Sequence, residues 1–169
     1  INIMTEEKIG IALGGGGSRG FVHLGVLKAL EEKGITPDVI SGVSAGSIVG
    51  VFIAAGMSPE KVMELMKENK FTDYAKVNMP VNGLLNLDNL KKNLEEYLPV
   101  NRFSDLELPF HVAVSNLNSG EIEYLQQGKL ISAIQASSSI PVLFSPVDIG
   151  GNSYADGGLL DNLPITPLE

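Results

Sequence analysis

Short apolar runs alternate with helix-like segments in the amino-terminal part of the chain, and this alternation limits the possible folds more than any other feature. KIGIALG (8–14) and PDVISG (37–42) are short apolar runs followed by glycine-containing turns, which is typical of buried strands. Between them, residues 21–33 carry apolar side chains at helical spacing and end before Gly34, a common helix terminator. The expected apolar positions of this helix are Val22, Leu24, Val26, Leu27 and Leu30.

The alternation continues along the rest of the chain. We predict further helices over 44–56, from Pro59 onward with Ser58 as N-cap, over 88–97 with Asp88 as cap, and near 129–138. Further strands are predicted over 110–116, 121–126, 146–151 and 152–158. Strands joined by helices imply parallel crossovers. We therefore predict an α/β fold, as a three-layer α/β/α sandwich with a mostly parallel central sheet, in a single domain over residues 1–169.

One segment between these elements is irregular. Residues 71–87 contain helix-breaking proline and glycine, and within them MPVNGLLNL (79–87) is an apolar loop. Such a loop either packs on the core or forms a lid or lipid-facing rim.

The composition excludes several classes of function. The chain has 12 Lys+Arg against 20 Asp+Glu, a formal net charge of −8, and its basic residues are scattered, so we expect no nucleic-acid partner. It has no cysteine, which excludes disulfides, thiol catalysis and cysteine metal sites. The amino terminus lacks the layout of a signal peptide, and the most apolar later stretch, residues 47–57, is too short to span a bilayer. We therefore expect a cytoplasmic protein.

The first motif with chemical meaning is GGGGSRG (14–20), which lies between a predicted strand and a predicted helix. It contains G-x-G-x-x-G, but a dinucleotide site needs an acidic residue at the far end of the next strand, and Asp38 stands at its start. A phosphate loop is excluded because no Lys-Ser/Thr pair follows Gly20. Backbone N–H groups at a helix start can also hold an oxyanion, with Arg19 adding positive charge nearby. The alternatives are a tightly packed glycine turn and nucleotide binding.

The second motif is GVSAG (42–46), in which Ser44 follows a strand and precedes a buried helix. This is the context of a nucleophile elbow, where a serine sits on a sharp strand-to-helix turn. Gly42 and Gly46 leave room for the strained backbone and for close approach of the helix to the strand. G-x-S-x-G also occurs by chance in ordinary loops.

A serine nucleophile needs a base, and the two histidines are poor candidates. No histidine follows Asp156, so the Ser, acid, His order of α/β-hydrolases cannot be assembled. His23 lies one turn into the first helix and is better explained as a packed, hydrogen-bonded side chain, and His111 begins a strand with no nearby motif. Asp156 is the better candidate, because Gly157 and Gly158 allow its turn to approach other backbone closely. Desolvation and strong oxyanion stabilisation would compensate for its weak basicity.

Taken together with SAIQASSSIPVLFSPV (132–147) and YADGGLLDNLP (154–164), these motifs make the chain resemble the patatin-like phospholipase family from about Lys8 to Pro164. The resemblance implies a Ser44–Asp156 catalytic dyad and hydrolysis of acyl esters in lipids, without metal or cofactor. It also implies an oxyanion hole in the loop 15–20, formed by Gly15, Gly16, Gly17 and Arg19. Motif-supporting glycines are Gly20, Gly42, Gly46, Gly157 and Gly158. The implied partners are a lipid or small ester substrate and, transiently, a membrane surface.

The chain departs from the family pattern at two points. Where such proteins often have Pro-Gly-[ValLeu]-Phe-Pro-Pro, it has Pro-Val-Leu-Phe-Ser-Pro (141–146), and it stops at Glu169, where the pattern usually continues with another strand and helix. The alternative to an active hydrolase is therefore a catalytically weak or silent scaffold, either truncated or engineered.

Overall fold

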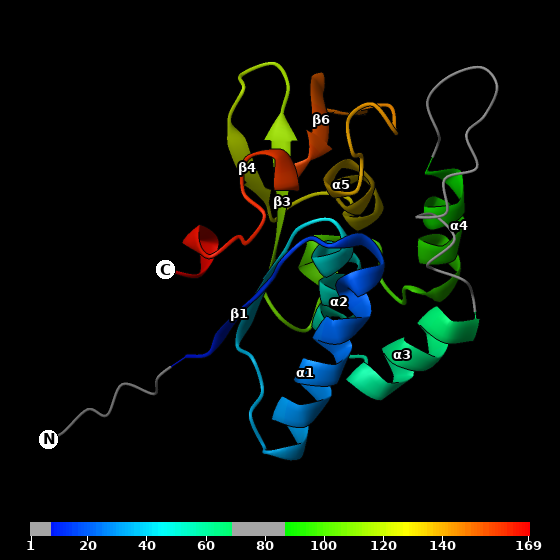
Figure 1. The fold of residues 1–169 in the computed structure, drawn as a ribbon, viewed down its shortest axis with the longest axis vertical. Coiled ribbons are helices and arrows are strands. Elements are labelled where there is room, and N and C mark those ends of the chain that lie inside the picture. Colours follow the sequence, from blue (N-terminus) through cyan, green and yellow to red (C-terminus); the bar gives the residue numbers. More distant parts are fainter. Residues whose placement is uncertain (1–7, 69–86) are drawn as a thin grey trace, which may run out of the picture.

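The computed structural model describes residues 8–68 and 87–169 as six strands and five α-helices, joined by short 3-10 helices (Figure 1). The strands are β1 (Gly10–Leu13), β2 (Val39–Gly42), β3 (Phe110–Asn116), β4 (Ile122–Leu125), β5 (Val147–Ile149) and β6 (Asn152–Asp156). The α-helices are α1 (Phe21–Glu32), α2 (Ala45–Ala54), α3 (Pro59–Glu68), α4 (Asp88–Tyr97) and α5 (Leu130–Ser137). The 3-10 helices are η1 (Gly17–Gly20), η3 (Phe103–Asp105), η4 (Gly157–Leu159) and η5 (Thr166–Leu168).

These elements confirm the predicted order of strands and helices. Ser58 caps α3 as expected, since its Oγ accepts a hydrogen bond from the N–H of Lys61 at 3.3 Å. Asp88 is the first residue of α4 rather than its cap, which is Leu87. An acidic residue in the first turn still favours the helix, because it complements the positive end of the helix dipole.

The sheet is mixed, and four of its six strands run in one direction. β1 pairs with β2 and β2 with β3 in parallel, while β6 is antiparallel to both β3 and β5, so that β5 points the same way as β1, β2 and β3. β4 is antiparallel to β3. The α/β prediction with a mostly parallel sheet is confirmed.

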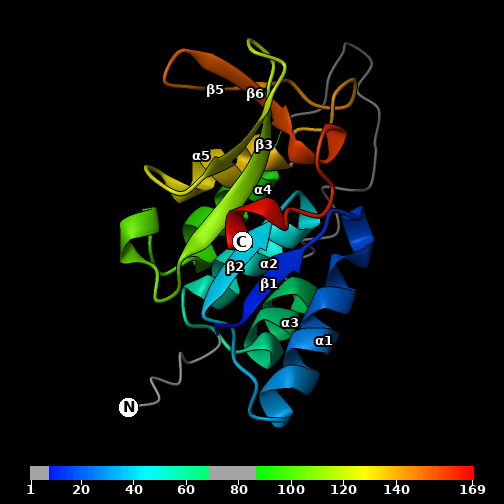
Figure 2. The ribbon, with the colours of Figure 1, turned by 90° about the vertical axis from the view of Figure 1, so that its left-hand side faces the viewer.

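The two parallel crossovers place α1, α2 and α3 on one face of the sheet. Because both crossovers move the chain in the same direction across the sheet, from β1 to β2 to β3, right-handed connections must put their helices on the same side. Figure 2 shows β1, β2 and β3 in front of these helices, with the carboxyl-terminal segment crossing the near face. There the hydroxyl of the buried Ser41 donates a hydrogen bond to the carbonyl oxygen of Pro164. Within the described residues, η5 of this segment packs on β1 and β2.

The core lies between the sheet and the helices, and α2 is buried along its whole length. The helix α1 differs from the prediction. Leu24 and Leu27 are buried, but Val22 and Val26 are 65% and 55% exposed. At 100° per residue, these two valines lie on the face of α1 opposite to Leu24, so α1 packs on the core through a narrower stripe than the sequence pattern predicted.

The apolar loop at 79–87 lies, apart from Leu87, outside the described residues. Among the helices of residues 8–68 and 87–169, none combines the length and the apolar character needed to cross a bilayer.

Candidate active site

The register of the sheet brings the two predicted catalytic segments together. Val112 of β3 pairs with both Gly42 and Leu125, and Val114 pairs with both Asp156 and Glu123. β4 therefore occupies one edge of β3, while β2 and β6 share the other edge and run toward each other along it. Ser44 follows the carboxyl end of β2, and Asp156 is the last residue of β6. The two segments thus meet in the gap between two strands that point at each other.

The turn at Ser44 has the backbone of a nucleophile elbow. Ser44 has φ 51° and ψ −123°, which is a strained conformation for a residue other than glycine, and it is only 7% exposed. Close packing surrounds this turn. A Cβ on Gly42 would lie 2.8 Å from the carbonyl oxygen of Gly46, and a Cβ on Gly46 would overlap the carbonyl oxygen of Leu13. Both glycines are therefore required for the approach of α2 to β1 and β2.

A run of three buried serines (137–139), which begins at the last residue of α5, holds both sides of the site. The N–H of Ser44 donates to the Oγ of Ser137 at 2.9 Å, and that hydroxyl donates to the carbonyl oxygen of Ala113 at 2.7 Å. Two residues further on, the carbonyl oxygen of Ser139 accepts the N–H of Asp156 at 2.9 Å. This run therefore fixes the nucleophile turn and the aspartate relative to the same strand.

Asp156 is buried, at 6% exposed, and its carboxylate is held by local hydrogen bonds. Burial raises the pKa of Asp156 above the ordinary value of an aspartate, because removal from water penalises the charged form. A side-chain hydrogen bond with Ser44 and the N–H of Gly158, which donates to Oδ1 at 2.8 Å, act in the opposite direction. Since burial prevails, the carboxylate is a stronger base than a free aspartate.

The glycine loop reaches the same place, but its amides are not equivalent. The N–H of Gly15 donates to the backbone oxygen of Asn162 at 3.3 Å and so ties the loop to the carboxyl-terminal segment. The N–H groups of Gly16 and Gly17 donate to no residue that the structure describes. Arg19 is exposed and its N–H donates to the oxygen of Gly16 at 3.1 Å.

A cavity of about 330 Å³ joins these groups. The described residues that line it are Gly15, Gly16, Gly17, Ser44, Ile140, Pro141, Asp156, Gly158, Leu159 and Asn162. Asp156 is the one titratable side chain among them. Arg19 is absent from this described lining, as are both histidines, and the Nε2 of His23 instead pairs with the oxygen of Gly14 at 2.8 Å.

A second left-handed residue lies beside this cavity. Val142, next to the lining residue Pro141, has φ 73° and is 87% exposed. Ser44 and Val142 are the two residues other than glycine with positive φ in the described part of the chain.

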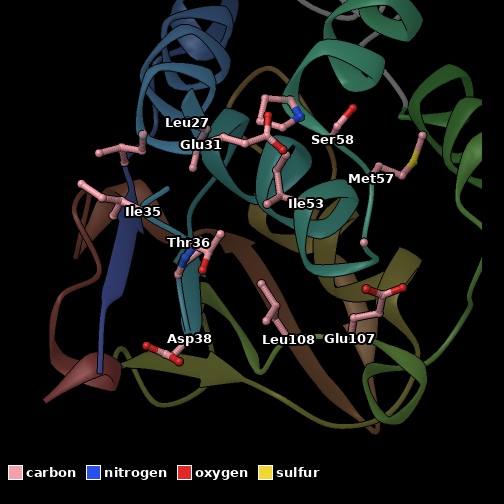
Figure 3. A pocket seen from close by; sticks show the side chains of 14 residues that line it. Leu27, Glu31, Ile35, Thr36, Asp38, Ile53, Met57, Ser58, Glu107 and Leu108 are labelled. Atoms are coloured by element: carbon pink, nitrogen blue, oxygen red, sulfur yellow. The ribbon is translucent and has the colours of Figure 1, made fainter. Parts of the chain in front are cut away.

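A larger cavity, of about 460 Å³, opens at the other end of the parallel strands, before β2 and β3 begin (Figure 3). Apolar side chains such as Leu27, Ile35 and Leu108 line it together with the exposed carboxylates of Glu31 and Glu107. Asp38 also borders it, and its Oδ2 accepts the N–H of Ile9 at 2.7 Å. The position of Asp38 confirms that it lies at the wrong end of the strand for a nucleotide site at the glycine loop.

Sequence reasoning missed Ser137 and Asn162 as parts of the site. Both lie inside quoted motifs, ASSSIP and DNLP, so the signal available was their proximity to the chemical motifs rather than a spacing rule. Their contacts depend on how distant segments meet, which local pattern does not encode.

Comparison with known proteins places the fold in a family. A family model described as patatin-like phospholipase matches residues 11–169. An uncharacterized NTE family protein of Mycobacterium bovis is 31% identical over 166 residues, which make up 97% of this chain and 46% of that protein. Lysophospholipase NTE1 of Saccharomyces cerevisiae is 31% identical over 176 residues, covering 99% of this chain and 10% of that protein. The chain thus spans about half the length of the mycobacterial relative.

Among solved structures, VipD from Legionella pneumophila matches with a TM-score of 0.66. The match covers 94% of this chain and 47% of that chain at 20% sequence identity, and it supports the fold.

Proposed function

Because this chain belongs to the patatin-like phospholipase family, we propose that it is a serine acyl hydrolase that cleaves carboxylic ester bonds of phospholipids or other lipid esters. The observation that carries this proposal is the meeting of Ser44 and Asp156 in one cavity beside two backbone N–H groups that have no partner among the described residues. The yeast relative supports a lipid substrate, since it is named as a lysophospholipase.

In the proposed reaction, the Oγ of Ser44 attacks the carbonyl carbon of the ester. Asp156 accepts the hydroxyl proton as the new C–O bond forms, and returns it to the leaving alcohol when the ester C–O bond breaks. Water then hydrolyses the acyl-enzyme, with Asp156 again accepting and returning the proton. The left-handed backbone of Ser44 presents its Oγ to the cavity, as nucleophile elbows do.

The negative charge that develops on the substrate oxygen needs donors, and the glycine loop supplies them. We assign this role to the N–H groups of Gly16 and Gly17. Loss of one oxyanion donor typically costs about 2.7–4 kcal/mol in the barrier. The N–H of Gly15 acts differently, because its bond to Asn162 holds the loop over the site. Arg19 contributes positive charge near the loop rather than a direct contact with the described cavity.

Two substitutions test the dyad. In Ser44→Ala and Asp156→Ala, we expect hydrolysis of a p-nitrophenyl ester to fall by about a thousandfold or more, with folding retained by circular dichroism. Asp148→Ala, which removes an exposed carboxylate on β5, should keep its activity. Unchanged turnover in either dyad variant would refute the assignment.

A fluorophosphonate probe separates an active hydrolase from a silent scaffold. Such a probe reacts with a serine that is activated by a base and an oxyanion hole, so it reports on all three at once. We expect labelling of the unmodified protein and none of Ser44→Ala. Folded protein that takes up no probe would identify the silent scaffold.

A further inference from the structure

Exposed aliphatic side chains border the Ser44 cavity on two sides. Ile140 and Leu159 line the cavity itself, and the side chain of Leu163 lies within reach of Gly14 at the start of the glycine loop. We call this set of five residues the apolar rim. Its members and their exposed fractions are Ile140 40%, Val142 87%, Leu159 54%, Leu160 53% and Leu163 53%. Two segments far apart in the sequence, 140–142 and 159–163, thus each contribute one aliphatic residue to the cavity lining and carry further exposed aliphatic side chains close to it in the chain.

Val142 has an unusual backbone conformation that presents its side chain to the outside. A β-branched residue with φ 73° is a rare outlier, since its Cβ crowds the neighbouring backbone in the left-handed region. Packing inside the protein does not compensate for this strain, because the side chain is 87% exposed. The turn itself is held by the backbone, since the N–H groups of Leu143 and Phe144 both donate to the carbonyl oxygen of Ile140, and it presents the valine side chain to the outside.

The charge around the rim indicates what that contact is. Residues 140–146 and 157–165 contain no lysine or arginine, and Asp161 is their one acidic residue. Its carboxylate is turned to the protein, where Oδ2 accepts the hydroxyl of Tyr124 at 2.7 Å and Oδ1 accepts the N–H of Leu163 at 3.1 Å. With a net charge of −8 on the whole chain, an anionic surface would be repelled. The apolar rim therefore suits a lipid surface without net charge.

We infer that the apolar rim docks the protein on a zwitterionic phospholipid surface, with Val142 as the inserting tip, and so brings the cavity to its lipid substrate. This inference rests on the proposed function, because a lipid hydrolase needs its opening to face the lipid. The binding partner of the apolar rim is the phospholipid surface rather than a protein.

Vesicle binding tests the inference without relying on catalysis. The Ser44→Ala protein is floated with phosphatidylcholine vesicles, and the same measurement is made after adding Val142→Asn. Asparagine tolerates the left-handed backbone, so this change removes apolar surface while keeping the turn. We expect the partition coefficient to fall about tenfold, as for loss of one buried aliphatic side chain. Val26→Asn, at an equally apolar exposed position on α1, should bind like its parent.

An activity comparison ties the binding to the site. With Ser44 restored, Val142→Asn should hydrolyse a short-chain monomeric ester within about twofold of the unmodified protein. It should lose about tenfold on phosphatidylcholine vesicles, since only the aggregated substrate requires docking.

Several results would overturn the inference. These are no binding to phosphatidylcholine, binding that needs anionic lipid, or equal binding by the Val142→Asn and Val26→Asn proteins. A dimer that Val142→Asn dissociates, without vesicle binding, would assign the rim to contact between copies of the chain. Failure of the proposed function looks different, because vesicle binding would then persist while ester hydrolysis and probe labelling are absent.

Discussion

The two left-handed turns beside the cavity, at Ser44 and at Val142, are strained in the same way but held differently. Ser44 is buried, its N–H is bound by Ser137, and the packing around Gly46 leaves its turn no room to relax. Val142 is exposed, and its side chain contributes little to the core. Each such conformation costs about 1–3 kcal/mol. Packing in the interior holds the first turn, whereas two backbone hydrogen bonds, from the N–H groups of Leu143 and Phe144 to the carbonyl oxygen of Ile140, hold the second.

The strongest test of this contrast removes the close packing at the buried turn. Gly46→Ala would drive a methyl group into the carbonyl oxygen of Leu13, so we expect a loss of at least about 4 kcal/mol in the free energy of unfolding, or failure to fold. Denaturant titration measures it. Gly25→Ala is the matched control, since a Cβ there meets nothing within 4 Å on α1, and it should stabilise by up to about 1 kcal/mol. A stable Gly46→Ala protein would show that packing does not hold the turn.

Removing the hydrogen bond under the buried turn should have a smaller effect. Ser137→Ala leaves the N–H of Ser44 and the carbonyl oxygen of Ala113 without this partner, so we expect a loss of about 1–3 kcal/mol in stability. We also expect a fall in kcat with little change in KM, because Ser44, the proposed nucleophile, is displaced. The neighbouring Ser138→Ala removes a buried hydroxyl that has no hydrogen-bond partner among the described residues, and it should be neutral or slightly stabilising. Equal effects of the two changes would contradict the positioning role of Ser137.

The exposed turn should respond in the opposite direction. Val142→Gly relieves the left-handed strain and gives up almost no packing, so the free energy of unfolding should rise by up to about 1 kcal/mol. Thermal unfolding at one pH is sufficient to measure it. Destabilisation would mean that Val142 packs in solution and that the two turns are alike.

Ionisation of Asp156 makes the stability of the folded protein depend on pH. Burial raises the pKa of Asp156 in the folded protein. The protonated carboxyl therefore makes its full contribution to the free energy of unfolding below the ordinary pKa of aspartate. That contribution is lost as the pH rises through the raised pKa. Asp156→Asn lacks this loss, and its Tm should exceed that of the unmodified protein at neutral pH, with the gap closing toward pH 4. An unchanged gap across this range would show that the carboxylate is not held at a raised pKa.

The same shift predicts the acid limb of the activity. Because Asp156 must be ionised to accept a proton, kcat/KM should fall with decreasing pH through a pKa above the ordinary value of aspartate. A limb at or below that ordinary value would point to a different base.

Much of the fold was predictable because its signals are local. The strands and helices follow from short apolar runs, helical spacing and glycine stops, and the nearness of Ser44 to Asp156 followed from motifs. The end-to-end approach of β2 and β6 along β3 was not predictable, since it depends on register between distant strands. The same holds for the capture of the Gly15 N–H by Asn162, which reduced the set of free amides in the loop.

The buried stripe of α1 could not be predicted for a similar reason. Val22 and Val26 fit an apolar repeat as well as Leu24 does, and only the packed structure decides which stripe faces the sheet. The left-handed turn at Val142 was also hidden, because a valine gives no local sign of that conformation. Val142 stands where the family pattern often has glycine, and this departure indicated the position but not its backbone conformation.

The contact between the hydroxyl of Ser41 and the carbonyl of Pro164 has a consequence for the order in which the chain folds during synthesis. These residues are 123 positions apart, and the cavity beside them needs Asp156 and Asn162 as well as the glycine loop. During synthesis, the turn around Ser44 leaves the ribosome long before the segment that completes its surroundings. Contacts of such separation form late in folding. On the proposed mechanism, a growing chain therefore carries Ser44 without Asp156, and hydrolysis is expected to begin only when the closing segment has docked.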